Sequence, residues 1–130
     1  MNAKLAVVMA GVTMLLAAAP VFAHHSFAAT YFENQSATIQ GTLVEFVCRN
    51  PHSFVTMDAT DPKTHAVVHW TIEWASSKRL EREGVNAGTL KPGDLVTILG
   101  HPGRITEEHR LHMWGISRPS DGWKWGHAID

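Results

Sequence analysis

The clearest pattern along this chain is the strict alternation of hydrophobic and polar positions between residues 67 and 74. One set of alternate positions holds Val68, Trp70, Ile72 and Trp74, and the other holds Val67, His69, Thr71 and Glu73. A period of two is typical of a β-strand with one buried face and one more polar face. Residues 67–74 are therefore predicted to form a strand whose tryptophans lie on the core side.

Weaker versions of the same pattern predict further strands on both sides of this one. The segment 38–48 is rich in β-branched and aromatic residues, but its alternation slips near Val44 and Gly41 lies inside it, which indicates a long strand that bends or bulges. Residues 76–83 predict a short helix with Ser76 or Ser77 as N-cap and Gly84 as its end. The remaining predicted elements are strands at 54–59, 95–100 and 110–117, and a last hairpin into 123–125.

The order of these elements is three strands, one helix and two strands. This is the order of a five-stranded OB-type barrel, in which a helix lies between the third and fourth strands. We therefore expect an all-β fold with one short helix: an OB-like barrel domain over residues 38–130, preceded by an extended N-terminal arm over 24–37. An open meander packed by one helix is the competing architecture.

The first 23 residues have the pattern of an export signal. Lys4 is followed by an uncharged apolar stretch from residue 5 to residue 19, and Val21-Phe22-Ala23 has the small residues of a cleavage site. The stretch is shorter than the ~20 residues of a spanning helix, and no second apolar segment follows. The mature protein is expected to begin at His24, without a membrane span, in the periplasm or the extracellular medium.

The composition of the chain bears on its binding partners and on its cysteine chemistry. Without residues 1–23 the chain keeps ten basic and twelve acidic residues, a balance that gives no electrostatic footprint for nucleic acid or an anionic membrane. Cys48 is the only cysteine, so no internal disulfide can form. It is expected to be a small buried hydrophobe, with a metal ligand or a reactive thiol as the alternatives.

Four short motifs, taken in order and spacing, resemble a family of small exported bacterial proteins that is classed as a domain of unknown function. The motifs are Ala-His-His-Ser-Phe at 23–27, Gly-Thr-Leu-Val-Glu at 41–45, Asn-Pro-His at 50–52 and Leu-Lys-Pro-Gly-Asp at 90–94. The resemblance implies export and a compact β-rich fold. It implies no activity and supplies no catalytic residues.

The residue at the expected new N-terminus suggests metal chemistry. The amine and Nδ1 of an N-terminal His24 can chelate one metal ion, and a further imidazole, from His25 or His52, would complete a T-shaped set. Such a set resembles the histidine brace of copper oxygenases and suits Cu(II). The alternative is that cleavage leaves a histidine there by chance. A copper-dependent oxidase would need, in addition, open coordination positions and a surface for a substrate.

The other histidines carry weaker signals. His69 and Glu73 share a strand face but lie four residues apart, which is too far for one ion. His109 and His112 are expected to face opposite sides of a strand. We therefore expect a binding protein rather than an enzyme, with copper as its possible cofactor.

An interaction module is the rival hypothesis. It would hold a glycan or a partner protein on an aromatic barrel face, and the residues proposed for that face are Trp114, Trp123 and Trp125.

Overall fold

The computed structural model describes residues 26–127, and the chain divides into a unit ending at Thr30 and a second unit beginning at Tyr31. In the first unit, residues 26–30 form a helical turn in which the Thr30 hydroxyl donates to the Ser26 carbonyl oxygen at 3.2 Å. This turn replaces the extended conformation expected there. The metal-ligand candidates His24 and His25 lie outside the described residues.

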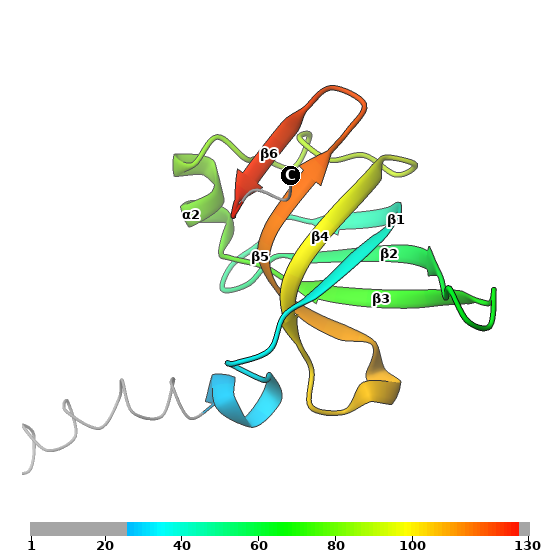
Figure 1. The fold of residues 1–130 in the computed structure, drawn as a ribbon. Coiled ribbons are helices and arrows are strands. Elements are labelled where there is room, and N and C mark those ends of the chain that lie inside the picture. The colour runs from blue at the N-terminus through cyan, green and yellow to red at the C-terminus, as the bar shows by residue number, and fades with distance from the viewer. Residues whose placement is uncertain (1–25, 128–130) are drawn as a thin grey trace, which may run out of the picture. The chain divides into compact units, whose positions relative to one another are not determined.

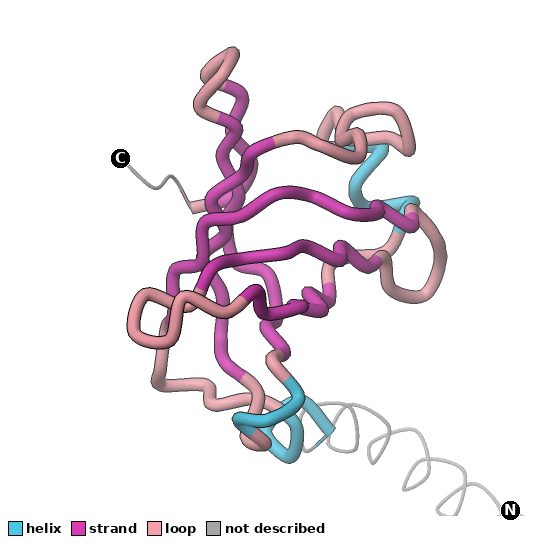
Figure 2. The backbone as a smooth tube through the Cα atoms, turned by 90° about the vertical axis from the view of Figure 1, so that its right-hand side faces the viewer, coloured by secondary structure: helices cyan, strands magenta, loops and turns pink. Residues whose placement is uncertain are grey.

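The second unit is a β-barrel with a short helix (Figures 1 and 2). Its elements are β1 (Ala37–Val47), β2 (Phe54–Thr60), β3 (Val67–Glu73), α2 (Ser77–Arg82), β4 (Leu95–Pro102), the 3₁₀ turn η1 (Thr106–Glu108), β5 (Arg110–Arg118) and β6 (Trp123–Gly126). The expected order of three strands, a helix and two strands is present, and the last hairpin adds β6.

Two features close the barrel. The sheet runs in the order β3-β2-β1-β4-β5-β6, and β3 also pairs with β5 in parallel, so the first five strands form a closed ring. The long strand β1 belongs to both halves of the barrel, because its residues 37–42 pair with β4 and its residues 42–47 pair with β2. The predicted OB-like barrel is therefore confirmed, and the open meander is wrong.

The predicted irregularity in β1 is also present. The register between β1 and β2 shifts between Leu43 and Glu45, which is the bulge expected near Val44. At Gly41 a Cβ atom would lie 2.3 Å from the carbonyl oxygen of Asp58, so only glycine fits where β1 crosses β2. The bend at the bulge lets one strand change its partner from β4 to β2.

The helix α2 begins where its sequence signals indicate. The Ser76 side chain accepts a hydrogen bond from the Arg79 backbone N–H at 3.3 Å, and Gly84 follows the helix with φ of 83°. Leu80 is the buried residue of this helix and packs into the barrel core. Its burial contributes about 1.5–3 kcal/mol.

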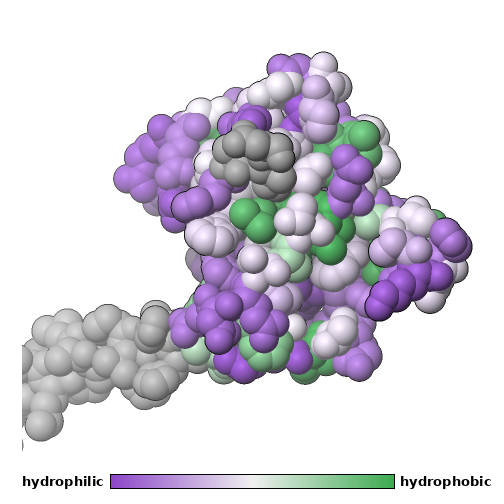
Figure 3. All heavy atoms as spheres, viewed as in Figure 1, coloured by the Kyte–Doolittle hydropathy of each residue, from purple (hydrophilic) through white to green (hydrophobic). Residues whose placement is uncertain are grey.

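The core consists of alternate residues from the inner faces of the strands, among them Val55, Met57, Ile72 and Ile98. In Figure 3, hydrophilic side chains gather over α2 and over the turn between β2 and β3, and hydrophobic patches lie between them. Within the described residues, no helix is both long enough and apolar enough to cross a membrane.

Candidate functional site

A row of polar side chains crosses three neighbouring strands of the barrel. Glu73 on β3 is the register partner of His112 on β5, and His112 is in turn the partner of His101 on β4. Register partners project from the same face of a sheet. Because their neighbours Ile72 and Leu111 are fully buried in the core, the row of Glu73, His112 and His101 lies on the outer face of the barrel.

Glu73 is the hub of this cross-strand row. The Tyr31 hydroxyl donates to its Oε2 at 2.6 Å, and the His52 Nδ1–H donates to its Oε1. The guanidinium of Arg110 lies 3.9 Å from Oε2. The Glu73 side chain is only 14% exposed, so one shielded carboxylate orders groups from the β1–β2 loop, from β5 and from the segment before β1.

The protonation states follow from these contacts. Burial alone would raise the pKa of Glu73, but hydrogen bonds from Tyr31 and His52 outweigh burial and hold its pKa below the usual value. Burial, followed by the bond to Glu73, raises the pKa of Tyr31 far above that of a free phenol. Burial lowers the pKa of His112, although the charge of Glu73 opposes this shift. The site at neutral pH therefore has a charged carboxylate, a neutral phenol and a neutral, half-buried imidazole.

His52 has the geometry of an oriented metal ligand. It follows Pro51 in the loop between β1 and β2, its side chain is 53% exposed, and its Nδ1–H is bonded to Glu73. A bond from one ring nitrogen to a carboxylate fixes the tautomer and presents the other nitrogen, Nε2, as a lone-pair donor. The loop also borders an open depression of 360 Å³ together with Arg49 and Phe54. A ligand in solution can therefore reach this imidazole.

His101 is oriented in a similar way at the far end of the row. Its Nδ1–H donates to the backbone carbonyl of Gln35 at 2.8 Å, and its ring stacks on Trp114 at 5.3 Å with an interplanar angle of 21°. A backbone carbonyl fixes the tautomer as effectively as a carboxylate does. An oriented imidazole therefore lies at each end of the row: His52 is bonded to Glu73 at one end, and His101 is itself the other end.

The three candidate tryptophans are distributed over two separate surroundings. Trp114 is 39% exposed and contacts His101 and, at 4.3 Å between ring centroids, His127. Trp123 and Trp125 on β6 are half-buried and pack against the core. The rings of Trp125 and the buried Trp74 form a T-shaped contact with 4.9 Å between their centroids. The ring contacts of the described residues do not join Trp114 to the other two.

Sequence reasoning missed most of the row. It set Glu73 beside His69 and judged them too far apart, whereas His69 pairs with Asp58 across the strand at 2.5 Å and Glu73 serves the row. It considered His112 only together with His109, and Tyr31, which is 2% exposed, was not among its candidate site residues. The usable signal was the topology, since an OB barrel closes by setting the third strand beside the fifth.

Cys48 follows directly after β1 as a free thiol, and it is half-buried rather than fully buried as expected. Among residues 26–127, no three histidine, cysteine or acidic side chains are close enough together to hold a metal ion. The row is thus an ordered set of imidazoles and one carboxylate, and the described residues by themselves do not make a complete metal site.

The barrel and its row of polar side chains define a small OB-like β-barrel protein. The chain belongs to DUF6152, a family of unknown function whose family model matches residues 12–112. This agrees with the resemblance found in the sequence motifs. A search of curated protein sequences found no match.

Solved structures resemble the barrel at low sequence identity. The mitochondrial single-stranded DNA binding protein Rim1 of S. cerevisiae is 11% identical with a TM-score of 0.50, and the likeness covers 67% of this chain and 95% of Rim1. A mutant of TiaS in complex with agmatine is 17% identical with a TM-score of 0.47, covering 67% of this chain and 22% of TiaS. The protein PriB of Ralstonia solanacearum is 20% identical with a TM-score of 0.35, covering 64% of this chain and 95% of PriB. The likeness to Rim1 shows the fold alone.

Proposed function

We propose that this protein is exported, begins at His24 after cleavage behind Ala23, and acts as a small Cu(II)-binding protein. The amine and Nδ1 of His24 form the chelate, and the Nε2 atom of His52 supplies a third nitrogen, with His25 as the alternative donor. Imidazole and amine nitrogens suit Cu(II), which forms the most stable complexes in the divalent series.

The observation that carries the proposal is the bond between His52 and Glu73. Metal-binding histidines nearly always donate their second ring N–H to a carboxylate, a carbonyl or water, and Glu73 holds His52 in that way. Glu73 is itself shielded from solvent and accepts a hydrogen bond from Tyr31, so the carboxylate that orients His52 is held in place. Within the described part of the chain Nε2 of His52 has no hydrogen-bond partner, which leaves its lone pair for a metal ion.

The proposal depends on donors outside the described residues, because residues 26–127 contain no trio of ligands that could hold an ion. The decisive test is a Cu(II) titration of protein that was exported and processed in cells, after mass spectrometry has confirmed His24 as its first residue. The expected result is one tightly bound ion with a nitrogen hyperfine pattern in the electron spin resonance spectrum. Weak binding of several ions would overturn the proposal.

Variants separate the chelate from scattered surface histidines. Adding one alanine before His24 blocks the chelate and should abolish tight binding. His52→Gln should weaken it by about tenfold or more, and Glu73→Gln should weaken it about 10- to 100-fold by freeing the imidazole. His69→Gln is the matched control, because His69 is also bonded to a carboxylate but lies outside the row. An equal loss in His69→Gln would contradict the assignment.

A second candidate function is an interaction module that holds a glycan or a partner protein on the aromatic surface. The observation that favours it is the exposed indole of Trp114, stacked on His101. Binding of cell-wall fragments would be lost in Trp114→Ala and kept in Trp123→Ala, whose indole packs on the core instead. Absence of binding to any fragment would remove this candidate.

A further inference from the structure

A separate pocket of 380 Å³ lies away from the cross-strand row, between the first halves of β1 and β3. Its lining includes the half-buried indole of Trp70 and, around it, Ile39, Asp61, Pro62, Val68 and His109. We call it the Trp70 pocket. It is of the size that a small organic molecule fills.

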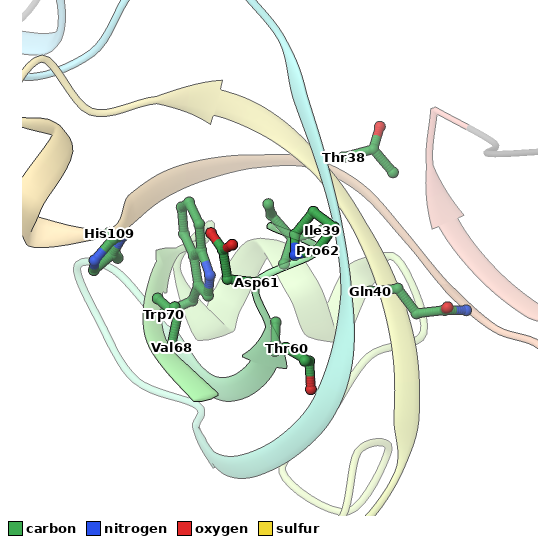
Figure 4. A pocket seen from close by; sticks show the side chains of 10 residues that line it. Thr38, Ile39, Gln40, Thr60, Asp61, Pro62, Val68, Trp70 and His109 are labelled. Carbon is green, nitrogen blue, oxygen red and sulfur yellow. The ribbon is translucent and has the colours of Figure 1, made fainter. Parts of the chain in front are cut away.

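The lining of the Trp70 pocket is part apolar and part polar. Figure 4 shows Trp70 near the centre with the carboxylate of Asp61 beside it in this view, whereas the side chains of Thr38 and Gln40 project beyond β1. The His109 ring packs against the indole in a T-shaped arrangement, with 5.2 Å between ring centroids. The pocket therefore combines one aromatic face, an aliphatic wall, one carboxylate and the polar groups of Thr60 and His109.

Asp61 is held in place as a charged group. Its Oδ1 accepts the backbone N–H groups of Lys63 and Thr64, both at 2.8 Å, in the turn after β2. These backbone bonds hold the pKa of Asp61 below the usual value, so the carboxylate is ionised at neutral pH. Both bonds are to Oδ1, and Oδ2 remains for a ligand.

The charges around the pocket select the sign of the ligand. The lining contains one acidic side chain and neither lysine nor arginine. Lys63 is the nearest basic residue in the sequence, but its side chain is exposed and is not part of the lining. A phosphate or carboxylate ligand would be repelled by the negative charge of Asp61, whereas a cation would be stabilised.

We propose that the Trp70 pocket binds a small organic ammonium ion. An ammonium group over the indole is attracted by the ring electrons, and tryptophan is the best aromatic residue for this contact. The carboxylate of Asp61 supplies the counter-charge, and Ile39, Pro62 and Val68 cover the alkyl part. A neutral sugar gains no ionic attraction from the Asp61 carboxylate, so it fits this site less well than a cation does.

The experiment is a calorimetric and NMR titration of the metal-free protein at pH 8 with choline, and separately with n-butylammonium, using glucose and acetate as comparison ligands. We expect one binding site, a shift of the Trp70 indole N–H resonance, and no binding of glucose or acetate. Equal binding of glucose, or no binding of either cation, would overturn the proposal.

Two variants test the assigned groups. Asp61→Asn keeps the Oδ1 acceptor of the turn but removes the charge, and should weaken choline binding by about tenfold. Asp58→Asn is the matched control, because Asp58 is a neighbouring acid on β2 that does not line the pocket. Equal losses of choline affinity in Asp61→Asn and Asp58→Asn would mean that the overall negative charge, and not the pocket, attracts the ligand, and would refute the site. Trp70→Phe keeps an aromatic ring and should give an intermediate loss.

The ammonium group could belong to a free molecule or to a lipid headgroup. Vesicles of phosphatidylcholine distinguish these sources. Binding of choline without sedimentation on vesicles supports a free ligand, and Asp61-dependent sedimentation supports the headgroup. Sedimentation that Asp61→Asn leaves unchanged would count against the pocket as the binding site. A failed copper titration would leave this result untouched, since the two sites share no residue.

Discussion

Removing one hydroxyl group from the cross-strand row is expected to cost a measurable part of the stability of the barrel. Tyr31→Phe keeps the buried ring but deletes the donor that bonds the Glu73 carboxylate at 2.6 Å. A hydrogen bond to a charged group contributes about 1.5–3 kcal/mol to the free energy of unfolding, roughly twice the value for a neutral pair. For a domain of this size, that loss lowers the melting temperature by on the order of 10 °C.

A double-mutant cycle tests whether the loss comes from the charge of Glu73. In a Glu73→Gln background the acceptor is neutral, so Tyr31→Phe should cost only about 0.5–1.5 kcal/mol. The difference between the two backgrounds is the coupling energy, expected to be about 1 kcal/mol. It is measured by urea unfolding of the processed protein at pH 7.5, with linear extrapolation to water.

The pH dependence gives a second readout of the same pair. The pKa of Glu73 is lowered in the folded protein, so its stabilisation is complete above the unfolded carboxyl pKa of about 4.3 and is lost as the pH falls through the folded value. The cost of Tyr31→Phe should stay constant from pH 8 to about pH 5 and shrink below. Equal costs in both backgrounds, or a cost under about 0.5 kcal/mol, would refute the reasoning.

Three further substitutions test other parts of the fold by the same unfolding measurement. Gly41→Ala should destabilise the barrel by about 1–3 kcal/mol or more, because its Cβ would lie 2.3 Å from the carbonyl oxygen of Asp58. Gly88→Ala is the control and should change the stability by less than about 0.5 kcal/mol. Similar effects of the two substitutions would contradict the close approach of β1 and β2. Because the pKa of His112 is lowered in the folded protein, the His112 imidazole takes up a proton at a higher pH in the unfolded chain than in the folded one. The wild type should therefore lose stability as the pH falls below about 6.5, and His112→Gln should lose less. Parallel curves of stability against pH for the two proteins would contradict this reasoning. Trp125→Phe should lower the free energy of unfolding by about 1–2 kcal/mol, because it removes the 2.7 Å hydrogen bond from the indole N–H to the carboxylate of Glu83, directly after α2, and weakens the contact with the buried indole of Trp74. No loss of stability would show that β6 adds nothing to the core.

Local signals in the sequence were sufficient for the strands, for the helix α2 and for the barrel, but not for the helical turn at residues 26–30 or for η1. The alternation in residues 67–74 predicted a strand, and β3 occupies Val67–Glu73. The slip near Val44 predicted the bulge, and Ser76 and Gly84 predicted the limits of the helix. These features depend on contacts within one element or one turn, so short windows of sequence contain the information.

The candidate site depends on contacts that no short window contains. His52 was identified as a candidate because of its position behind a proline, but its partner Glu73 lies 21 residues away, and Tyr31 lies 42 residues from Glu73. The three tryptophans expected to form one aromatic surface show the reverse case. They lie close together in the sequence, but the fold places Trp114 on an exposed face and packs Trp123 and Trp125 against the core.

The sequence by itself determined the strands, the bulge, the helix limits and the family to which the chain belongs, because each depends on local backbone preferences or on ordered motifs. Only the tertiary structure decided that Glu73, His112 and His101 form one row, because the parallel pairing of β3 with β5 sets their register. The same closure leaves the Trp70 pocket between β1 and β3, with Asp61 brought to it by the turn after β2. Side chains distant in the sequence meet only when a barrel closes, since closure brings non-consecutive strands to hydrogen-bonding distance.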